Sequence, residues 1–177
     1  MKYIQLILVF VTFSITISCN NSQTKQITNS KEYQTYLKVD ENVLLQNAEE
    51  ELNFWTTKLE KTPNQYPYYS KIATANAQIF NLTGDINQLK EAEKNVLAVN
   101  KKTNFNNAGY LRSLAKNYIS QHRFQEALAI LKKAEYNGEK LQQTNYMLID
   151  VHLDLGNLKK VEKYLSKVKN FKDFDNL

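Results

Sequence analysis

The fold is decided by residues 108–141, which read AGYLRSLAKNYISQHRFQEALAILKKAEYNGEKL. In the second half of this stretch, apolar residues recur at the i, i+3, i+4 and i+7 spacing of an amphipathic helix: Ala127, Ile130, Leu131 and Ala134. The first half surrounds one small residue with large ones: Leu111, Leu114, Ala115 and Tyr118. The pattern predicts two helices joined by a turn. They can pack closely because Ala115 and Ala127 are small.

The same pattern recurs 34 residues later, over residues 142–175. The recurring positions are Leu148, Ile149, Gly156, Leu158, Val161, Leu165 and Val168. Gly156 suits a tight turn because glycine tolerates positive φ, and Asn157 after it is a good helix N-cap. His122 and Arg123 occupy these two offsets in the preceding unit, and His152 stands where that unit has a tyrosine. A fixed period of this length is typical of a repeat architecture.

Two further segments extend the pattern upstream. Residues 66–107 read as a longer version of the unit, with a turn at Gly84 and Asp85. The expected core positions are Ile72, Ala73, Ala75 and Asn76 on the first helix and Ala92, Val96 and Val99 on the second. Residues 40–65 hold a helix that Asp40 can cap and that ends near Lys61, before Pro63. We expect this helix to cap the stack.

These units resemble the tetratricopeptide repeat, a 34-residue helix-turn-helix. In residues 108–141, Tyr118 and Ala127 match the tyrosine and the alanine of the family's pattern directly. Leu111 takes the place of the first aromatic residue of that pattern, and Leu131 takes the place of its later aromatic residue. Leu114 and Ala115 take the place of its leucine-glycine pair. The resemblance implies an all-α fold of antiparallel helix pairs stacked as an α-solenoid, with a concave groove for a peptide or a partner helix.

Composition agrees with a helical fold and argues against several functions. The 177 residues include only four glycines and two prolines, too few turn-forming residues for a sheet-rich fold. The net charge of +5 is mild, and lysines such as Lys132 and Lys133 stand near Glu135, so no nucleic-acid partner is expected. His122 and His152 lack ligands at metal spacing, and phosphate, dinucleotide and HExxH motifs are missing from the sequence. We expect no enzyme, metal or cofactor.

The N-terminus has the pattern of an export signal. Residues 1–18, MKYIQLILVFVTFSITIS, place Lys2 before an apolar run and end on a small residue. The run is too short and too interrupted for a membrane span. Cys19 follows at once, and the segment resembles a bacterial lipobox, although Thr16 stands where leucine is usual. The resemblance implies lipidation of Cys19 and anchoring in the bacterial cell envelope, at its periplasmic or outer-membrane face; a free cysteine beside an ordinary cleavage site is the alternative. Residues 19–39 are expected to form a flexible tether.

The family's groove offsets give seven candidate partner-binding residues: Ser70, Thr74, Arg112, Lys116, Ser120, Tyr146 and Asp150. Arg112 and Lys116 stand one helical turn apart and could receive a carboxylate. The asparagines of the family's carboxylate clamp are missing, so capture of a peptide C-terminus is not predicted. The resemblance implies a lipid-anchored interaction or assembly scaffold with a protein or peptide partner. These residues could equally be ordinary exposed helix positions.

An alternative function and the covering of the last unit remain open. A glycan- or nutrient-binding lipoprotein that assists an outer-membrane transporter would need an exposed aromatic platform, for which Tyr66, Tyr68 and Tyr69 are the densest cluster. The third unit ends at residue 175, and the sequence stops at Leu177 without a polar capping helix. We therefore expect either a longer array or a partner that covers the last unit.

Overall fold

The computed structural model describes residues 29–37 and 43–168, and all regular structure in these two ranges is helical. The all-α prediction is confirmed for this part of the chain. The helices are α2 (Ser30–Leu37), α3 (Val43–Lys61), α4 (Pro67–Thr83), α5 (Ile86–Lys102), α6 (Ala108–Ser120), α7 (Phe124–Asn137), α8 (Leu141–Asp154) and α9 (Leu158–Leu165). The first compact unit contains α2, and the second contains α3 to α9.

Helix α2 lies inside the segment that was predicted to be a tether. The side chain of Asn29 accepts a hydrogen bond from the backbone N–H of Lys31 at 3.1 Å, and the carbonyl of Asn29 accepts one from Glu32 at 2.9 Å. These bonds satisfy N–H groups that a helix start otherwise leaves unpaired. Residues 30–37 of that segment are therefore helical. The leader, with Cys19, lies outside the described residues.

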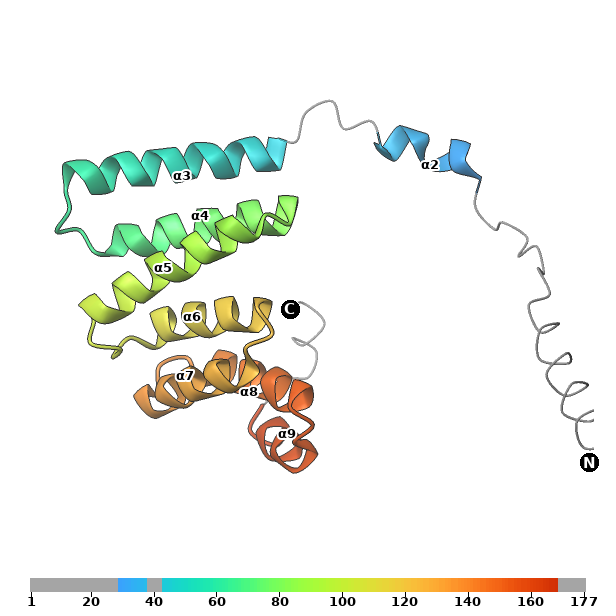
Figure 1. Ribbon diagram of the computed structural model, residues 1–177. Coiled ribbons are helices and arrows are strands. Elements are labelled where there is room, and N and C mark those ends of the chain that lie inside the picture. The colour runs from blue at the N-terminus through green and yellow to red at the C-terminus, as the bar shows by residue number, and fades with distance from the viewer. Residues whose placement is uncertain (1–28, 38–42, 169–177) are drawn as a thin grey trace, which may run out of the picture. The chain divides into compact units, whose positions relative to one another are not determined.

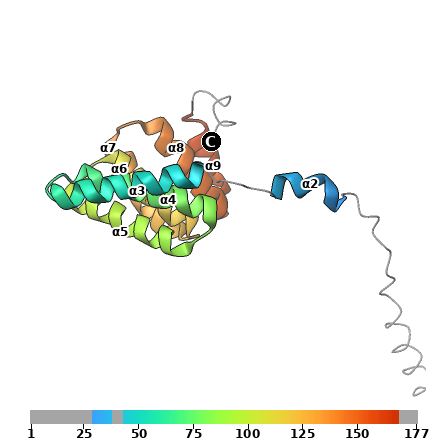
Figure 2. The same ribbon diagram turned by 90° about the horizontal axis from the view of Figure 1, so that it is seen from above.

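In the second unit each helix packs against the next one in the chain, from α3 to α9 (Figure 1). The view from above places α3 nearest the viewer, over α4 and α5 (Figure 2). Consecutive packing means that most tertiary contacts join segments close in sequence. None of the helices in the described ranges is long and apolar enough to cross a membrane.

The core of this unit is built from the small and large residues that the sequence pattern places on the inner helix faces. Ala115 and Ala127 are fully buried, as predicted, so α6 and α7 approach closely. Leu114 and Leu131 are also fully buried and fill the space around them. The predicted core positions of α4 and α5 are buried as well: Ile72, Ala73, Ala75, Asn76, Ala92, Val96 and Val99.

The helices of the 66–107 unit are longer than those of the 108–141 unit. Helices α4 and α5 have 17 residues each, against 13 in α6 and 14 in α7. The turn between α4 and α5 uses Gly84 at φ 72°, and the Asp85 side chain accepts the Asn87 N–H at 2.9 Å. Helix α9 has only 8 residues. Its Leu158, predicted to belong to the apolar pattern, is 64% exposed, whereas Val161 and Val168 are buried.

The same turn joins α6 to α7 and α8 to α9. His122 and Gly156, which are 34 residues apart, have φ of 56° and 70°. The N–H after each bonds to the carbonyl five residues back: Arg123 to Tyr118 at 2.9 Å, and Asn157 to His152 at 2.8 Å. Glycine adopts this left-handed conformation freely, whereas a residue with a Cβ pays for it in steric strain. His122 is therefore strained where Gly156 is not.

Reciprocal substitutions at the two turns should change stability in opposite directions. We expect His122→Gly to raise the free energy of unfolding by about 0.5 kcal/mol, because relief of strain exceeds the entropy that glycine adds to the unfolded chain. Gly156→Ala should lower it by about 1 kcal/mol through φ alone, since a Cβ there meets no atom within 4 Å. Urea denaturation measures both. Equal urea midpoints for wild type and both variants would contradict the assignment of backbone strain to His122.

Candidate functional site

A groove of about 340 Å³ runs over α4, α5 and α6. Its walls carry hydroxyl, amide and ammonium groups, and its floor is apolar. The walls are Ser70, Thr74, Gln78 and Asn81 from α4 and Ser113, Lys116, Asn117 and Ser120 from α6. The floor is Ala73, Ala77, Phe80, Leu89, Ala92 and Val96.

Helical periodicity brings these residues together. On α4, Ser70, Thr74, Ala77 and Asn81 follow i, i+4, i+7 and i+11, which places them on one face. On α6, the lining residues Ser113, Lys116, Asn117 and Ser120 follow i, i+3, i+4 and i+7. Alanines on the inner side leave the hollow open because their side chains are short.

The four hydroxyl groups of the groove already use their hydrogens. Each donates to a carbonyl of its own helix: Ser70 to Pro67 at 2.8 Å, Thr74 to Ser70 at 2.9 Å, Ser113 to Gly109 at 3.1 Å and Ser120 to Lys116 at 3.2 Å. A hydroxyl oxygen that donates one bond keeps its lone pairs for acceptance. The hydroxyls can therefore accept hydrogen bonds from N–H groups of a ligand.

The amides of the groove divide into two kinds. Asn117 is 6% exposed, and its amide is already hydrogen-bonded within the protein. Its Nδ2 donates to the Leu89 carbonyl at 3.1 Å, and its Oδ1 accepts from Gln121 at 2.6 Å. Gln78 and Asn81 are exposed, and their side chains have no hydrogen bond to any residue in the described ranges. Each offers a donor and an acceptor together, which is what a peptide group needs.

Lys116 is the charged residue of the groove. It is exposed on α6, and within residues 43–168 its ammonium has no ion pair. No Asp or Glu is among the residues that line the groove. The groove therefore presents a positive charge without an internal counter-charge, which favours an anionic group on a ligand.

Four of the seven predicted groove residues thus meet in one place: Ser70, Thr74, Lys116 and Ser120. Arg112 lies elsewhere. Its guanidinium is buried and donates to the Glu139 carbonyl at 2.9 Å and to Thr144 Oγ1 at 3.3 Å. Successive helix positions differ by about 100°, so Arg112 is turned from Ser113 toward α8. It is not placed to receive a carboxylate beside Lys116.

The last two predicted residues lie on α8, outside the groove. Tyr146 is 6% exposed, and its hydroxyl accepts from Gln142 at 3.2 Å. Asp150 is exposed on the same helix. The groove therefore covers the pair α4–α5 and the first helix of the next pair, α6, and does not extend to α8.

An ion-paired cluster that the sequence did not reveal is connected to the groove through the lining residue Asn117. The Nη1 of Arg123, in the turn after α6, lies 2.9 Å from both carboxylate oxygens of Glu93 on α5. Gln121 also donates to Glu93, at 2.8 Å, and to the groove residue Asn117. The cluster joins α5 to the α6–α7 turn. Its partners are about thirty residues apart, so no spacing within one helix could have revealed them.

The aromatic residues proposed for glycan binding do not share an exposed face. Tyr66 is 40% exposed. Tyr68 is half-buried with its ring centroid 5.3 Å from that of Trp55, and Tyr69 is half-buried against the core. A sugar platform needs accessible ring faces, and two of these three rings are largely covered.

The histidines do not form a metal site. His122 is exposed in a turn, with its ring 5.6 Å from that of Phe124. His152 is buried, and its ring is stacked at 5.6 Å on Tyr164. Both of its ring nitrogens lack a hydrogen-bond partner in the described part of the chain. In those same residues no cluster of three or more His, Cys, Asp or Glu side chains is arranged to hold a metal ion.

The chain was also compared with known proteins. No protein-family model matches it, and no curated protein matches it either.

Proposed function

We propose that this chain is a protein-interaction module of tetratricopeptide-type helix pairs stacked as an α-solenoid, and that its groove binds an extended segment of a partner protein. The packing of each helix on the next supports this architecture, as does the recurrence of one turn after 34 residues. The observation that carries the binding role is the groove, with its uncompensated Lys116 and its free amides.

The chemistry of the groove fits a peptide. Gln78 and Asn81 can each pair with a backbone amide, and the hydroxyl oxygens accept further N–H groups. The alanine-rich floor admits side chains of moderate size. An acidic side chain of the partner completes the match by pairing with Lys116.

Reversing the charge of the groove should abolish partner capture. We expect crosslinking on intact cells, followed by purification and mass spectrometry, to recover a set of proteins with the wild-type chain and to lose it with Lys116→Glu. Thr74→Arg, which fills the groove, should lose the same set. Lys159→Glu is the matched control, because Lys159 is exposed on α9 outside the groove. Recovery of one protein set by all four chains would contradict a role for the groove.

We further propose that a lipid on Cys19 holds this module on a membrane of the bacterial envelope. The order of a charged start, an apolar run, a small residue and the chain's one cysteine supports this. Two or more acyl chains give stable anchoring, because each buried methylene contributes about 0.8 kcal/mol. Replacing Cys19 with serine should therefore move the chain from the membrane fraction to the soluble fraction. Equal membrane retention of both chains would contradict lipid anchoring.

A further inference from the structure

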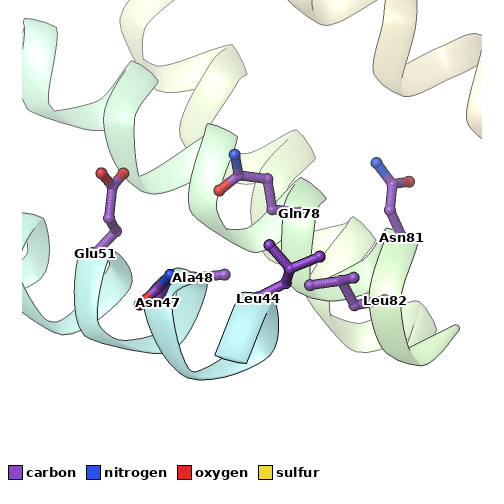
Figure 3. A pocket seen from close by; sticks show the side chains of 7 residues that line it. All are labelled: Leu44, Asn47, Ala48, Glu51, Gln78, Asn81 and Leu82. Atoms are coloured by element: carbon purple, nitrogen blue, oxygen red, sulfur yellow. The ribbon is translucent and has the colours of Figure 1, made fainter. Parts of the chain in front are cut away.

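A second hollow, which we call the notch, lies between α3 and α4. It has a volume of about 360 Å³ and is lined by Leu44, Asn47, Ala48, Glu51, Gln78, Asn81 and Leu82. Figure 3 shows Leu44 of α3 and Leu82 of α4 close together at one end of it, with Ala48 beside them. Leu44 is 67% exposed and Leu82 38%, whereas Ala48 is buried. The notch therefore offers two uncovered leucines around a small residue, which suits one apolar side chain.

The notch and the groove form one continuous surface. Gln78 and Asn81 line both of them. On α4, Asn81 belongs to the groove face, and Gln78 is turned toward α3. An extended segment that leaves the groove across these two amides enters the notch directly.

The two ends of this surface carry opposite charges. Glu51 is the charged residue of the notch, and Lys116 is that of the groove. Both are exposed, and neither has an ion pair within residues 43–168. Each charge is therefore available for a group of opposite sign on a ligand.

From this arrangement we infer that the notch and the groove together select one class of peptide. It is an extended segment with a leucine-sized apolar residue beside a lysine or arginine at the notch, and an acidic residue at the groove. The inference rests on the proposed peptide-binding function and adds the order of charges to it. The two ends lie on α3 and α6, which are connected through the packing of α4 and α5, and an extended chain rises about 3.3 Å per residue, so the two charged positions of the peptide are several residues apart.

Selection from a random peptide library tests this order of charges. The immobilised full chain is offered displayed peptides of about twelve residues, long enough at about 3.3 Å per residue to span both ends. We expect wild type to enrich peptides with a basic residue next to an aliphatic one and an acidic residue several positions away. Glu51→Lys should replace the basic preference with an acidic one and leave the other end unchanged. Lys116→Glu should change only the acidic preference.

Two further variants sharpen the test. Glu49→Lys is the matched control, because Glu49 is exposed two positions from Glu51 and lines neither hollow, so it should select the wild-type peptides. Leu44→Ser should weaken the aliphatic preference, because it removes one of the two uncovered leucines of the notch. For one enriched peptide carrying fluorescein, Glu51→Lys should raise Kd about tenfold or more in fluorescence anisotropy.

The possible failures are distinguishable. If Glu51→Lys and wild type enrich the same peptides while Lys116→Glu does not, the notch assignment is wrong and the groove remains the binding site. If wild type enriches no peptide above an empty support, or if Lys116→Glu changes nothing, the proposed function itself fails and this inference fails with it.

Discussion

Replacing Arg123 with alanine is expected to lower the free energy of unfolding by about 2–3 kcal/mol, an unusually large effect for a partly exposed side chain. Its guanidinium donates to Glu93, Glu126 and Gln121 and lies 4.2 Å from the centre of the Tyr118 ring. The Glu93 side chain is only 19% exposed, so the substitution leaves a carboxylate with little solvent to replace the lost partner.

The individual contacts of Arg123 should contribute unequally. The Glu126 side chain is 52% exposed, and Glu126→Ala should cost no more than about 0.5 kcal/mol because solvent screens the pair. Arg123→Lys keeps the charge but loses the planar guanidinium, so its stability should lie between those of wild type and Arg123→Ala. In a double-mutant cycle with Glu93→Gln, the coupling energy should exceed about 1 kcal/mol.

Urea denaturation measures these free energies of unfolding. Peptide binding to the groove is a second measurement of the same substitutions. Asn117 lines the groove and bonds to Gln121, which in turn bonds to Glu93. Arg123→Ala should therefore also weaken peptide binding, although Arg123 does not line the groove. A stability within about 0.5 kcal/mol of wild type, the range of ordinary surface substitutions, would show that the cluster is only a surface feature.

The parts of the fold that sequence could predict are those that depend on local spacing. The burial of Ala115 and Ala127 follows from an apolar stripe within one helix, and the positive φ of Gly156 follows from the chemistry of glycine. Helix periodicity also places Ser70 and Thr74 on one face of α4. These features need no knowledge of how the helices pack.

The rest depends on how helices pack against one another, which one sequence does not reveal. Family offsets alone placed Arg112 beside Lys116, but α8 and the turn before it cover Arg112. The notch was not foreseen because Leu44 and Leu82 are almost forty residues apart and meet only through the packing of α3 on α4. Glu51 stands in a run of three glutamates, Glu49 to Glu51, and their spacing alone does not indicate which carboxylate lies beside α4.

His152 should make the protein lose stability as the pH falls below about 6.5. Burial first, and then the ammonium groups of Lys132 and Lys160, lower the pKa of His152 from its ordinary value of 6.5, while Glu135 opposes them. Tyr164 covers one face of the ring. Because the folded state favours the neutral ring, the unfolded chain binds more protons below pH 6.5. The free energy of unfolding should then fall by at most about 1.4 kcal/mol per pH unit until the folded-state pKa is reached.

A second acid transition should remain separate from this one. Burial alone would raise the pKa of Glu135, but hydrogen bonds from Lys132, Lys167 and Tyr164 lower it from 4.5 to about 2. A carboxylate with a lowered pKa stabilises the fold above its unfolded value, and this contribution is lost as the pH falls from about 4.5 toward 2. Loss of stability between pH 6.5 and 5 therefore cannot come from Glu135.

The variant His152→Phe isolates the histidine. It keeps an aromatic ring against Tyr164 and removes two buried nitrogens that lack partners, so the protein should gain about 1 kcal/mol at pH 7.5. Its free energy of unfolding, from urea denaturation at a series of pH values, should be nearly constant between pH 7.5 and 5, where wild type declines. Glu135→Gln should keep the wild-type decline in this range. If His152→Phe declines as steeply as wild type, the His152 ring is as easily protonated in the folded chain as in the unfolded one, and its burial does not control the acid stability of the last helix pair.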